Sequence, residues 1–191
     1  MTGAKKYTFV SVDDYLRDED GADVKHEYVD GSVYAMGGAR NAHNIISLNI
    51  SAALWSRLRG LPCQPFNSDT KIRLRLQNGI RFYYPDASVV CAKNNQDDVF
   101  QDEPVVVFEV LSKRTRRIDE GEKKEAYCQL PSLKVYALVE QDSSDVRVFR
   151  RSGNSWSEQL YSGLDDVLPL PEIDVELPLS EIFSQIQFVA E

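Results

Sequence analysis

The chain has 191 residues, of which 42% are hydrophobic and 27% are charged, and its formal net charge is −8. This length and composition are those of a globular domain that can bury a substantial core, so we expect a single domain over residues 1–191. A negative net charge argues against general nucleic-acid binding, because contacts to phosphates need clustered Lys and Arg. No apolar run approaches the roughly 20 residues that span a bilayer, and residues 1–10 contain no apolar core of signal-peptide length. The expectation is therefore a protein with no membrane association.

The three cysteines, Cys63, Cys91 and Cys128, are odd in number and widely spaced. They form neither a CxxC motif nor a zinc-ligand pattern. Free thiols are typical of proteins in a reducing compartment. The sequence thus predicts three free thiols and a cytoplasmic location.

The first predicted elements are a short helix and a hairpin. Ser11 and Asp14 fit a capping box, which predicts a helix over residues 12–18. Asp30-Gly31 separates two strand-like runs within residues 25–36, and an Asp-Gly pair in that position is a strong hairpin signal.

The next elements are a long helix and several strands. A helix that Asn41 could cap is expected over residues 41–59, with an apolar face formed by Ile45, Leu48, Ala52, Trp55 and Leu58. Residues 71–76 alternate strictly and predict a half-exposed strand, with Lys71, Arg73 and Arg75 on the exposed face. Strands over residues 81–84 and 87–91 flank Pro85, which cannot donate a ladder hydrogen bond.

The second half of the chain begins with a central strand over residues 105–111, which is apolar on both faces apart from Glu109. A helix is predicted over residues 119–130, ended by Pro131. Three strands are predicted to follow, over residues 134–140, 146–151 and 156–161. The proline-rich tail, residues 168–179, is expected to form an edge strand or a wrapping segment that ends in a short helical turn.

Two carboxylates lie in segments that are otherwise apolar, Asp86 after Pro85 and Glu109 within the predicted central strand. A buried acid costs several kcal/mol unless it is neutralised. If the two strands are neighbours, the carboxylates converge, and a cation such as Mg²⁺ would balance their charge. Each residue also has a structural explanation: Asp86 as a turn residue and Glu109 as the partner of a buried arginine.

Asp119, Lys123 and Tyr127 are spaced so that they share one face of the predicted helix. From that face Lys123 could approach the carboxylates, where it would orient a water or stabilise the charge of a phosphoryl transition state. The alternatives are a capping box formed by Asp119 and Glu122, and a packing role for Tyr127.

A basic run, Lys113–Arg117, separates the Glu109 strand from this helix. Such a run is ordinarily a solvated loop. A helix N-terminus, however, favours anions over cations, so this placement favours contact with phosphates. The phosphate-binding candidates are Arg114, Arg116 and Arg117.

In this order, the motifs resemble the PD-(D/E)xK nuclease superfamily and, more narrowly, its Uma-type "putative restriction endonuclease" family. The resemblance covers most of the chain, including the hairpin at residues 26–31, the PDASVV stretch at residues 85–90 and His43. Its most specific part is EVLS, residues 109–112, followed by Asp119, Lys123 and Tyr127. It implies an α/β, restriction-endonuclease-like fold in which a mixed central β-sheet is flanked by α-helices.

The resemblance also implies a metal site. Asp86, Glu109 and the carbonyl of Val110 would bind Mg²⁺ or Mn²⁺, with Glu27 as a further acidic ligand; Glu27 is equally explained as a hairpin residue. The superfamily lysine stands two residues after the acid, where this chain has Leu111. Lys123 on the next helix is therefore the candidate amine, with Lys124 as a weaker one, and the residues that would support the site are Asp119, Tyr127 and His43.

The leading hypothesis is a Mg²⁺-dependent endonuclease that hydrolyses phosphodiester bonds in DNA. Asp86 and Glu109 would hold the metal, and Lys123 would assist the reaction. Two alternatives stay open: a non-catalytic binding or assembly module that retains the nuclease fold, and a hydrolase of smaller phosphate esters. DNA is the expected partner, and cutting both strands of a duplex at a defined position would favour a homodimer.

Overall fold

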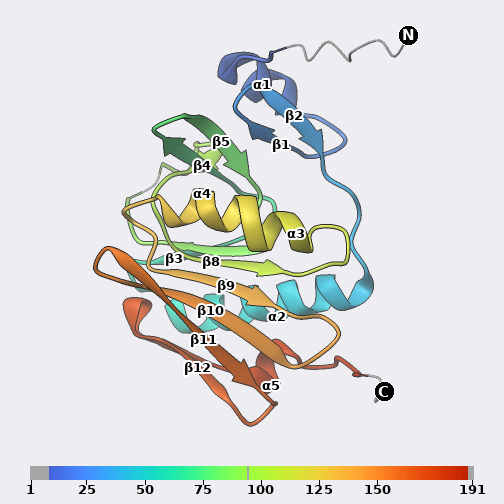
Figure 1. Ribbon diagram of the computed structural model, residues 1–191, viewed down its shortest axis with the longest axis vertical. Helices are drawn as coiled ribbons and strands as arrows, with labels where there is room; N and C mark the ends of the chain where they lie inside the picture. Colours follow the sequence, from blue (N-terminus) through green and yellow to red (C-terminus); the bar gives the residue numbers. More distant parts are fainter. Residues whose placement is uncertain (1–8, 94, 189–191) are drawn as a thin grey trace.

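The structure is a computed structural model that describes residues 9–93 and 95–188, so most of the segment considered for a signal peptide lies outside it. A six-stranded sheet lies at its centre, with the strand order β11-β10-β9-β8-β6-β3 (Figure 1). Neighbouring strands are antiparallel except β8 and β9, which are parallel, so the sheet is mixed. Its strands are β3 (Gln64–Asn67), β6 (Ala87–Val90), β8 (Pro104–Val110), β9 (Val135–Val139), β10 (Asp145–Ser152) and β11 (Ser155–Ser162).

Two smaller sheets complete the architecture. A five-stranded sheet has the order β2-β1-β5-β4-β7, with β1 (His26–Val29), β2 (Ser32–Ala35), β4 (Lys71–Leu76), β5 (Gly79–Tyr83) and β7 (Phe100–Gln101). Helix α1 (Val12–Glu19) packs against it through Tyr15, whose ring contacts those of Tyr28 and Phe82. The third sheet pairs β12 (Val167–Leu170) with β13 (Val175–Pro178) through the 3₁₀ turn η2 (Pro171–Ile173), and α5 (Leu179–Ile182) follows.

Helices cover both faces of the central sheet. Helix α2 (Asn41–Leu58), the two-stranded sheet and α5 share a core with one face. Over the other face runs a continuous helical segment made of α3 (Arg116–Ile118), the π-helical turn η1 (Asp119–Lys123) and α4 (Lys124–Cys128), and the five-stranded sheet lies beyond it (Figure 1). Because strand side chains alternate, Val106 and Phe108 of β8 point toward α2 while Val107 and Glu109 point toward α4. The predicted mixed sheet flanked by helices is confirmed.

None of the helices in the described part of the chain is long and apolar enough to cross a membrane.

The buried face of α2 differs from the predicted one. Leu48 and Trp55 are 67% and 60% exposed, and the side chains that enter the core are Ile46, Ile50, Ala53, Leu54 and Leu58. Apolar residues occupy so many positions between 45 and 58 that two adjacent faces both fit a helical period, and only tertiary packing selects between them. The N-cap of this helix is Arg40, one residue before the predicted Asn41.

Lys71 was expected on the exposed face of its strand, and this expectation is wrong. The residue is 8% exposed, and its ammonium donates to the Tyr84 hydroxyl at 3.2 Å. The alternation itself is confirmed, since Ile72 and Leu74 are fully buried. Lys71 departs from it because the chain that follows β5 covers it.

The prediction of three free thiols is wrong for two of them. Cys63 and Cys91 form a disulfide, and Cys128 is free. Strand β3, which the sequence analysis missed, pairs with β6 so that Gln64 lies opposite Val90. This register places the two cysteines opposite each other just beyond the ends of the pairing. Because two of the three cysteines form a disulfide, the cysteines no longer support the prediction of a reducing compartment.

Candidate active site

A pocket of about 660 Å³ opens where the two large sheets approach each other. Its walls come from the β1–β2 hairpin, the segment that leads into α2, and the segment that links β8 to η1. Four carboxylates and one ammonium group meet in it: Glu27, Asp86, Glu109, Asp119 and Lys123. These five residues are called the acidic floor below.

Asp86 reaches the floor because the chain changes sheets at this point. Strand β5 ends at Tyr83 in the five-stranded sheet, and β6 begins at Ala87 in the six-stranded sheet. The carboxylate accepts a hydrogen bond from the backbone N–H of Val110 at 2.7 Å and lies 3.3 Å from Nε2 of His43. Since β6 and β8 are antiparallel neighbours, Asp86 and Glu109 lie side by side at the edge of this strand pair.

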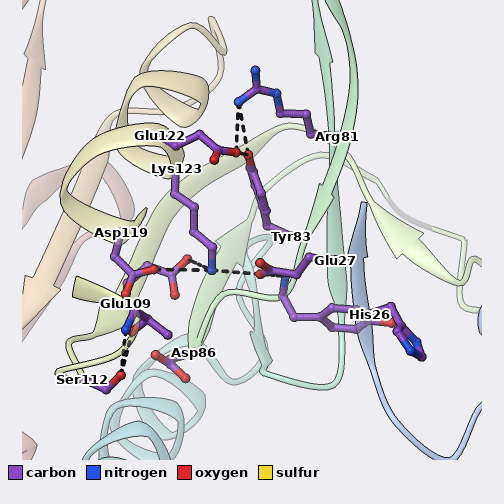
Figure 2. Close-up of polar contacts among 12 residues, drawn as sticks. His26, Glu27, Arg81, Tyr83, Asp86, Glu109, Ser112, Asp119, Glu122 and Lys123 are labelled. Carbon is purple, nitrogen blue, oxygen red and sulfur yellow. Dashed lines mark hydrogen bonds and ion pairs between the residues drawn. The ribbon is translucent and has the colours of Figure 1, made fainter. Parts of the chain in front are cut away.

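Lys123 is the centre of the acidic floor (Figure 2). Its Nζ lies 2.8 Å from Glu27 Oε1, 3.3 Å from Glu109 Oε1 and 3.5 Å from Asp119 Oδ1. These carboxylates come from β1, β8 and η1 respectively, so one ammonium group joins both large sheets and the helix between them. Lys123 is only 6% exposed and Glu109 only 3%.

The helical segment carries a π turn at the point where it contributes to the floor. Both buried residues of this turn, Asp119 and Lys123, face the carboxylates from β1 and β8. Such turns often occur at functional sites, because they re-aim side chains that a regular α-helix would send elsewhere. The backbone carbonyl of Asp119 accepts a hydrogen bond from the buried Tyr136 hydroxyl at 2.8 Å, which fixes the turn on the central sheet. The capping-box reading of Asp119 does not hold, because the helix already begins at Arg116.

The electrostatics of the floor follow from burial. Burial raises the pKa of Glu109 well above its usual range; the Lys123 ammonium opposes this shift, and the charges of Asp119 and Asp86 reinforce it. Burial also raises the pKa of Asp119. Burial lowers the pKa of Lys123, but Glu109, Glu27 and Asp119 outweigh that effect and hold it well above the usual value. The ammonium therefore stays charged, and the floor has more acidic groups than basic ones.

This donor set suits a divalent cation that completes its coordination with substrate. The described residues include no group of three or more His, Cys, Asp and Glu side chains arranged as a metal site. Mg²⁺ is commonly held by one or two carboxylates together with substrate phosphates and water, so Asp86 and Glu109 are sufficient in number. Within the described residues the buried Oδ1 of Asp119 accepts no hydrogen bond, and its charge is balanced by the Lys123 ammonium at 3.5 Å.

The remaining predicted residues lie around the floor in different ways. Arg114 and Arg117 are exposed at the pocket mouth, whereas the guanidinium of Arg116 pairs with Glu140 and Glu120 and does not line the pocket. Tyr127 is buried beneath the floor between two other tyrosine rings, and its hydroxyl has no hydrogen-bond partner among the residues that the structure describes. Lys124 lies over the Phe149 ring, 4.5 Å from its centre, and not at the floor.

Sequence reasoning missed a polar cluster beside Lys123. The hydroxyl of Tyr83 donates to Glu122 Oε1 at 2.7 Å, and Arg81 approaches the same oxygen at 3.4 Å (Figure 2). The Lys123 ammonium lies 5.4 Å from the centre of the Tyr83 ring. A tyrosine in a predicted strand is normally interpreted as a core residue. The local sequence does not indicate that Tyr83 contacts a helical segment about 40 residues later.

The comparisons with known proteins identify the family of this chain. The Uma2 family model, described as "Putative restriction endonuclease", matches residues 12–180. The chain belongs to the Uma2 family. The predicted resemblance to this family is confirmed.

Two relatives and one solved structure are similar to this Uma2 chain. Uncharacterized protein slr1290 of Synechocystis is 33% identical over 181 residues, which is 94% of each chain. Uncharacterized protein sll1609 of the same organism is 28% identical over 144 residues, covering 74% of this chain and 80% of that protein. A crystal structure of a protein described as a putative nuclease belonging to DUF820, from Anabaena variabilis, superposes with a TM-score of 0.72 at 16% identity. It covers 93% of this chain and 99% of that one, which establishes a shared fold.

Removal of the Lys123 ammonium should destabilise the metal-free protein. Lys123→Met leaves Glu27, Glu109 and Asp119 buried without their cation, so we expect the free energy of unfolding to fall by about 3 to 5 kcal/mol. Adding Glu109→Gln to Lys123→Met should recover part of this loss, because one of the unpaired acids is then neutral. Urea denaturation in the presence of a chelator measures both effects.

The neighbouring Lys124→Met is the matched control. This variant should change stability by less than about 1 kcal/mol, since Lys124 contributes only a cation–π contact. Equal effects of the two lysine substitutions would contradict the assigned role of Lys123.

Proposed function

We propose that this protein is a Mg²⁺-dependent endonuclease that hydrolyses phosphodiester bonds in DNA. One observation carries the proposal: two strand-end carboxylates and a buried lysine ammonium meet in a pocket with basic side chains at its mouth. The family description supports the nuclease class. Phosphate-bearing substrates suit this arrangement, because the mouth attracts anions while the floor favours a divalent cation.

In this proposal Asp86, Glu109 and the backbone carbonyl of Val110 bind the metal. Glu27 joins them through its second oxygen, because Oε1 already contacts Lys123 and the backbone N–H of Tyr84. When bound, Mg²⁺ supplies a Lewis acid that activates water for attack on phosphorus and neutralises charge at the phosphate. His43 and the backbone N–H of Val110 orient the Asp86 carboxylate.

Lys123 acts as a fixed positive charge. Its raised pKa keeps it protonated near neutral pH, so it is not a general base. The ammonium orients the attacking water and stabilises the negative charge that develops on the phosphoryl oxygens. Asp119 positions the ammonium through its ion pair, and the buried ring of Tyr127 packs beneath the floor.

Arg114 and Arg117 bind the DNA backbone at the pocket mouth. Both are exposed, line the pocket and form no salt bridge in the described part of the chain. Arg116, which the sequence grouped with them, is engaged by Glu140 and Glu120. These basic side chains attract phosphates locally, so a phosphate-bearing substrate is compatible with the net charge of −8.

Substitution of the metal-binding carboxylates tests the catalytic proposal. Asp86→Asn and Glu109→Gln should each reduce Mg²⁺-dependent cleavage of DNA by at least about 100-fold, because each removes one of the carboxylate charges that hold the metal. Glu181→Gln is the control: this acid pairs with Arg57 away from the pocket, so cleavage should be unchanged. Gel assays with circular and linear DNA in Mg²⁺, Mn²⁺ or chelator measure the rates.

The outcomes separate the alternatives. Cleavage that persists in both carboxylate variants would contradict the proposed site. Stabilisation of the wild-type protein by Mg²⁺ without cleavage of any DNA would instead favour a non-catalytic binding module.

The salt dependence of DNA binding tests the proposed phosphate contacts. Arg114→Gln and Arg117→Gln should each reduce the slope of log affinity against log salt by about 0.7 to 0.9, the value for one lost phosphate contact. Exposed Arg59 lies beyond the far end of α2 and is the matched control, so Arg59→Gln should leave the slope unchanged. Fluorescence anisotropy in a Glu109→Gln background avoids cleavage during the titration. An unchanged slope in both mouth variants would remove Arg114 and Arg117 from the interface.

A further inference from the structure

Tyr34 is an exposed aromatic residue on the wall of the same pocket. It lies on β2 directly opposite Glu27 in the β1–β2 ladder. Directly opposed residues point to the same face with Cβ atoms about 5 Å apart. Glu27 belongs to the acidic floor and contacts the Lys123 ammonium at 2.8 Å, so Tyr34 is a direct neighbour of the floor.

Within the described residues the side chain of Tyr34 has no hydrogen bond and no ring contact, and the residue is 53% exposed. Tyr34 thus presents a free aromatic face to the pocket. The core does not use this ring, because the buried tyrosine of the hairpin is Tyr28.

Arg114 contacts the opposite wall of the pocket. Its guanidinium packs so closely on Gly37 that a Cβ atom there would overlap it, and its Nη2 lies 3.5 Å from the carbonyl oxygen of Gly38. Arg114 therefore reaches from the segment after β8 to the loop after β2. Glu109 and Lys123, on the floor of the same pocket, are almost fully buried.

We propose that Tyr34 stacks on an unpaired base next to the scissile phosphate, and that the substrate of the proposed nuclease is single-stranded DNA. In a duplex both faces of each base are covered by its neighbours, so a ring this close to the floor has no free base to contact. A single strand offers a free face at every nucleotide. The inference rests on the proposed function and specifies its substrate.

The unpaired cations that line the pocket fit the same substrate. Arg40, Lys113 and Arg117 are exposed, line the pocket and form no salt bridge among the described residues. Basic side chains that follow the backbone, combined with an aromatic ring that stacks on a base, are the usual means of binding single strands without sequence preference.

Binding measurements with the Glu109→Gln variant test the inference without cleavage. The probes are a labelled 16-nucleotide single strand of mixed sequence and the blunt duplex of the same sequence. We expect the single strand to bind at least about tenfold more tightly. Tyr34→Ala should weaken that binding by about 5- to 150-fold, the effect of losing one stacked base. Tyr34→Phe should retain it, because the ring and not the hydroxyl makes the contact.

The matched control is Trp55→Ala. Trp55 is similarly exposed, at 60%, but it lies twelve residues after His43 on α2, about 18 Å along the helix. Its substitution should leave the affinity for both probes unchanged.

Equal or tighter binding of the duplex would overturn the inference, as would single-strand binding that is unchanged in Tyr34→Ala. These failures are distinct from a failure of the proposed function. If the wild-type protein and Tyr34→Ala cleave linear duplex DNA at equal Mg²⁺-dependent rates, the nuclease stands and the single-strand inference falls. If neither single strand nor duplex is cleaved, the proposed function itself is contradicted.

Discussion

The ion pairs around the Lys123 ammonium are the interaction on which the rest of the structure depends. They join β1 of the five-stranded sheet, β8 of the central sheet and the π turn between α3 and α4. Buried charges of this kind contribute little net stability when they are paired, but they are costly to leave unpaired. The arrangement therefore fixes the relative positions of the two sheets, and the same contacts form the floor of the pocket. The same charged groups therefore hold the two sheets together and take part in the proposed chemistry.

The floor also explains how an acidic chain can suit an anionic substrate. Four carboxylates meet one ammonium group in a setting where burial raises the pKa of Glu109 and Asp119. A divalent cation would relieve this excess of acid, and its own charge would then favour a phosphate above it. The exposed arginines at the mouth extend the favourable potential outward. The electrostatic potential in this pocket is set by the local placement of charged side chains, and not by the net charge of −8.

Local patterns single out two residues of the acidic floor. Glu109 stands out because an acid inside a run of valines needs a partner, and Lys123 because it is one helical turn from Asp119. Contacts that depend on strand pairing could not be predicted in this way. Strand β3 has no strong strand signal, so its pairing with β6, and with it the disulfide, was missed. The ion pair of Arg116 with Glu140 and the position of Tyr34 beside the floor likewise depend on tertiary structure. On α2, apolar residues on two faces left the choice of buried face to packing.

Diffraction from crystals soaked in Mn²⁺ is the most direct test of the central claim that the acidic floor binds a divalent cation. Anomalous scattering locates Mn²⁺ independently of any assumption about the ligands. The account predicts an anomalous peak within coordination distance of the Asp86 and Glu109 carboxylates in the wild-type protein, and no such peak in Glu109→Gln. A floor without an anomalous peak at saturating Mn²⁺, or an undiminished peak in Glu109→Gln, would contradict it.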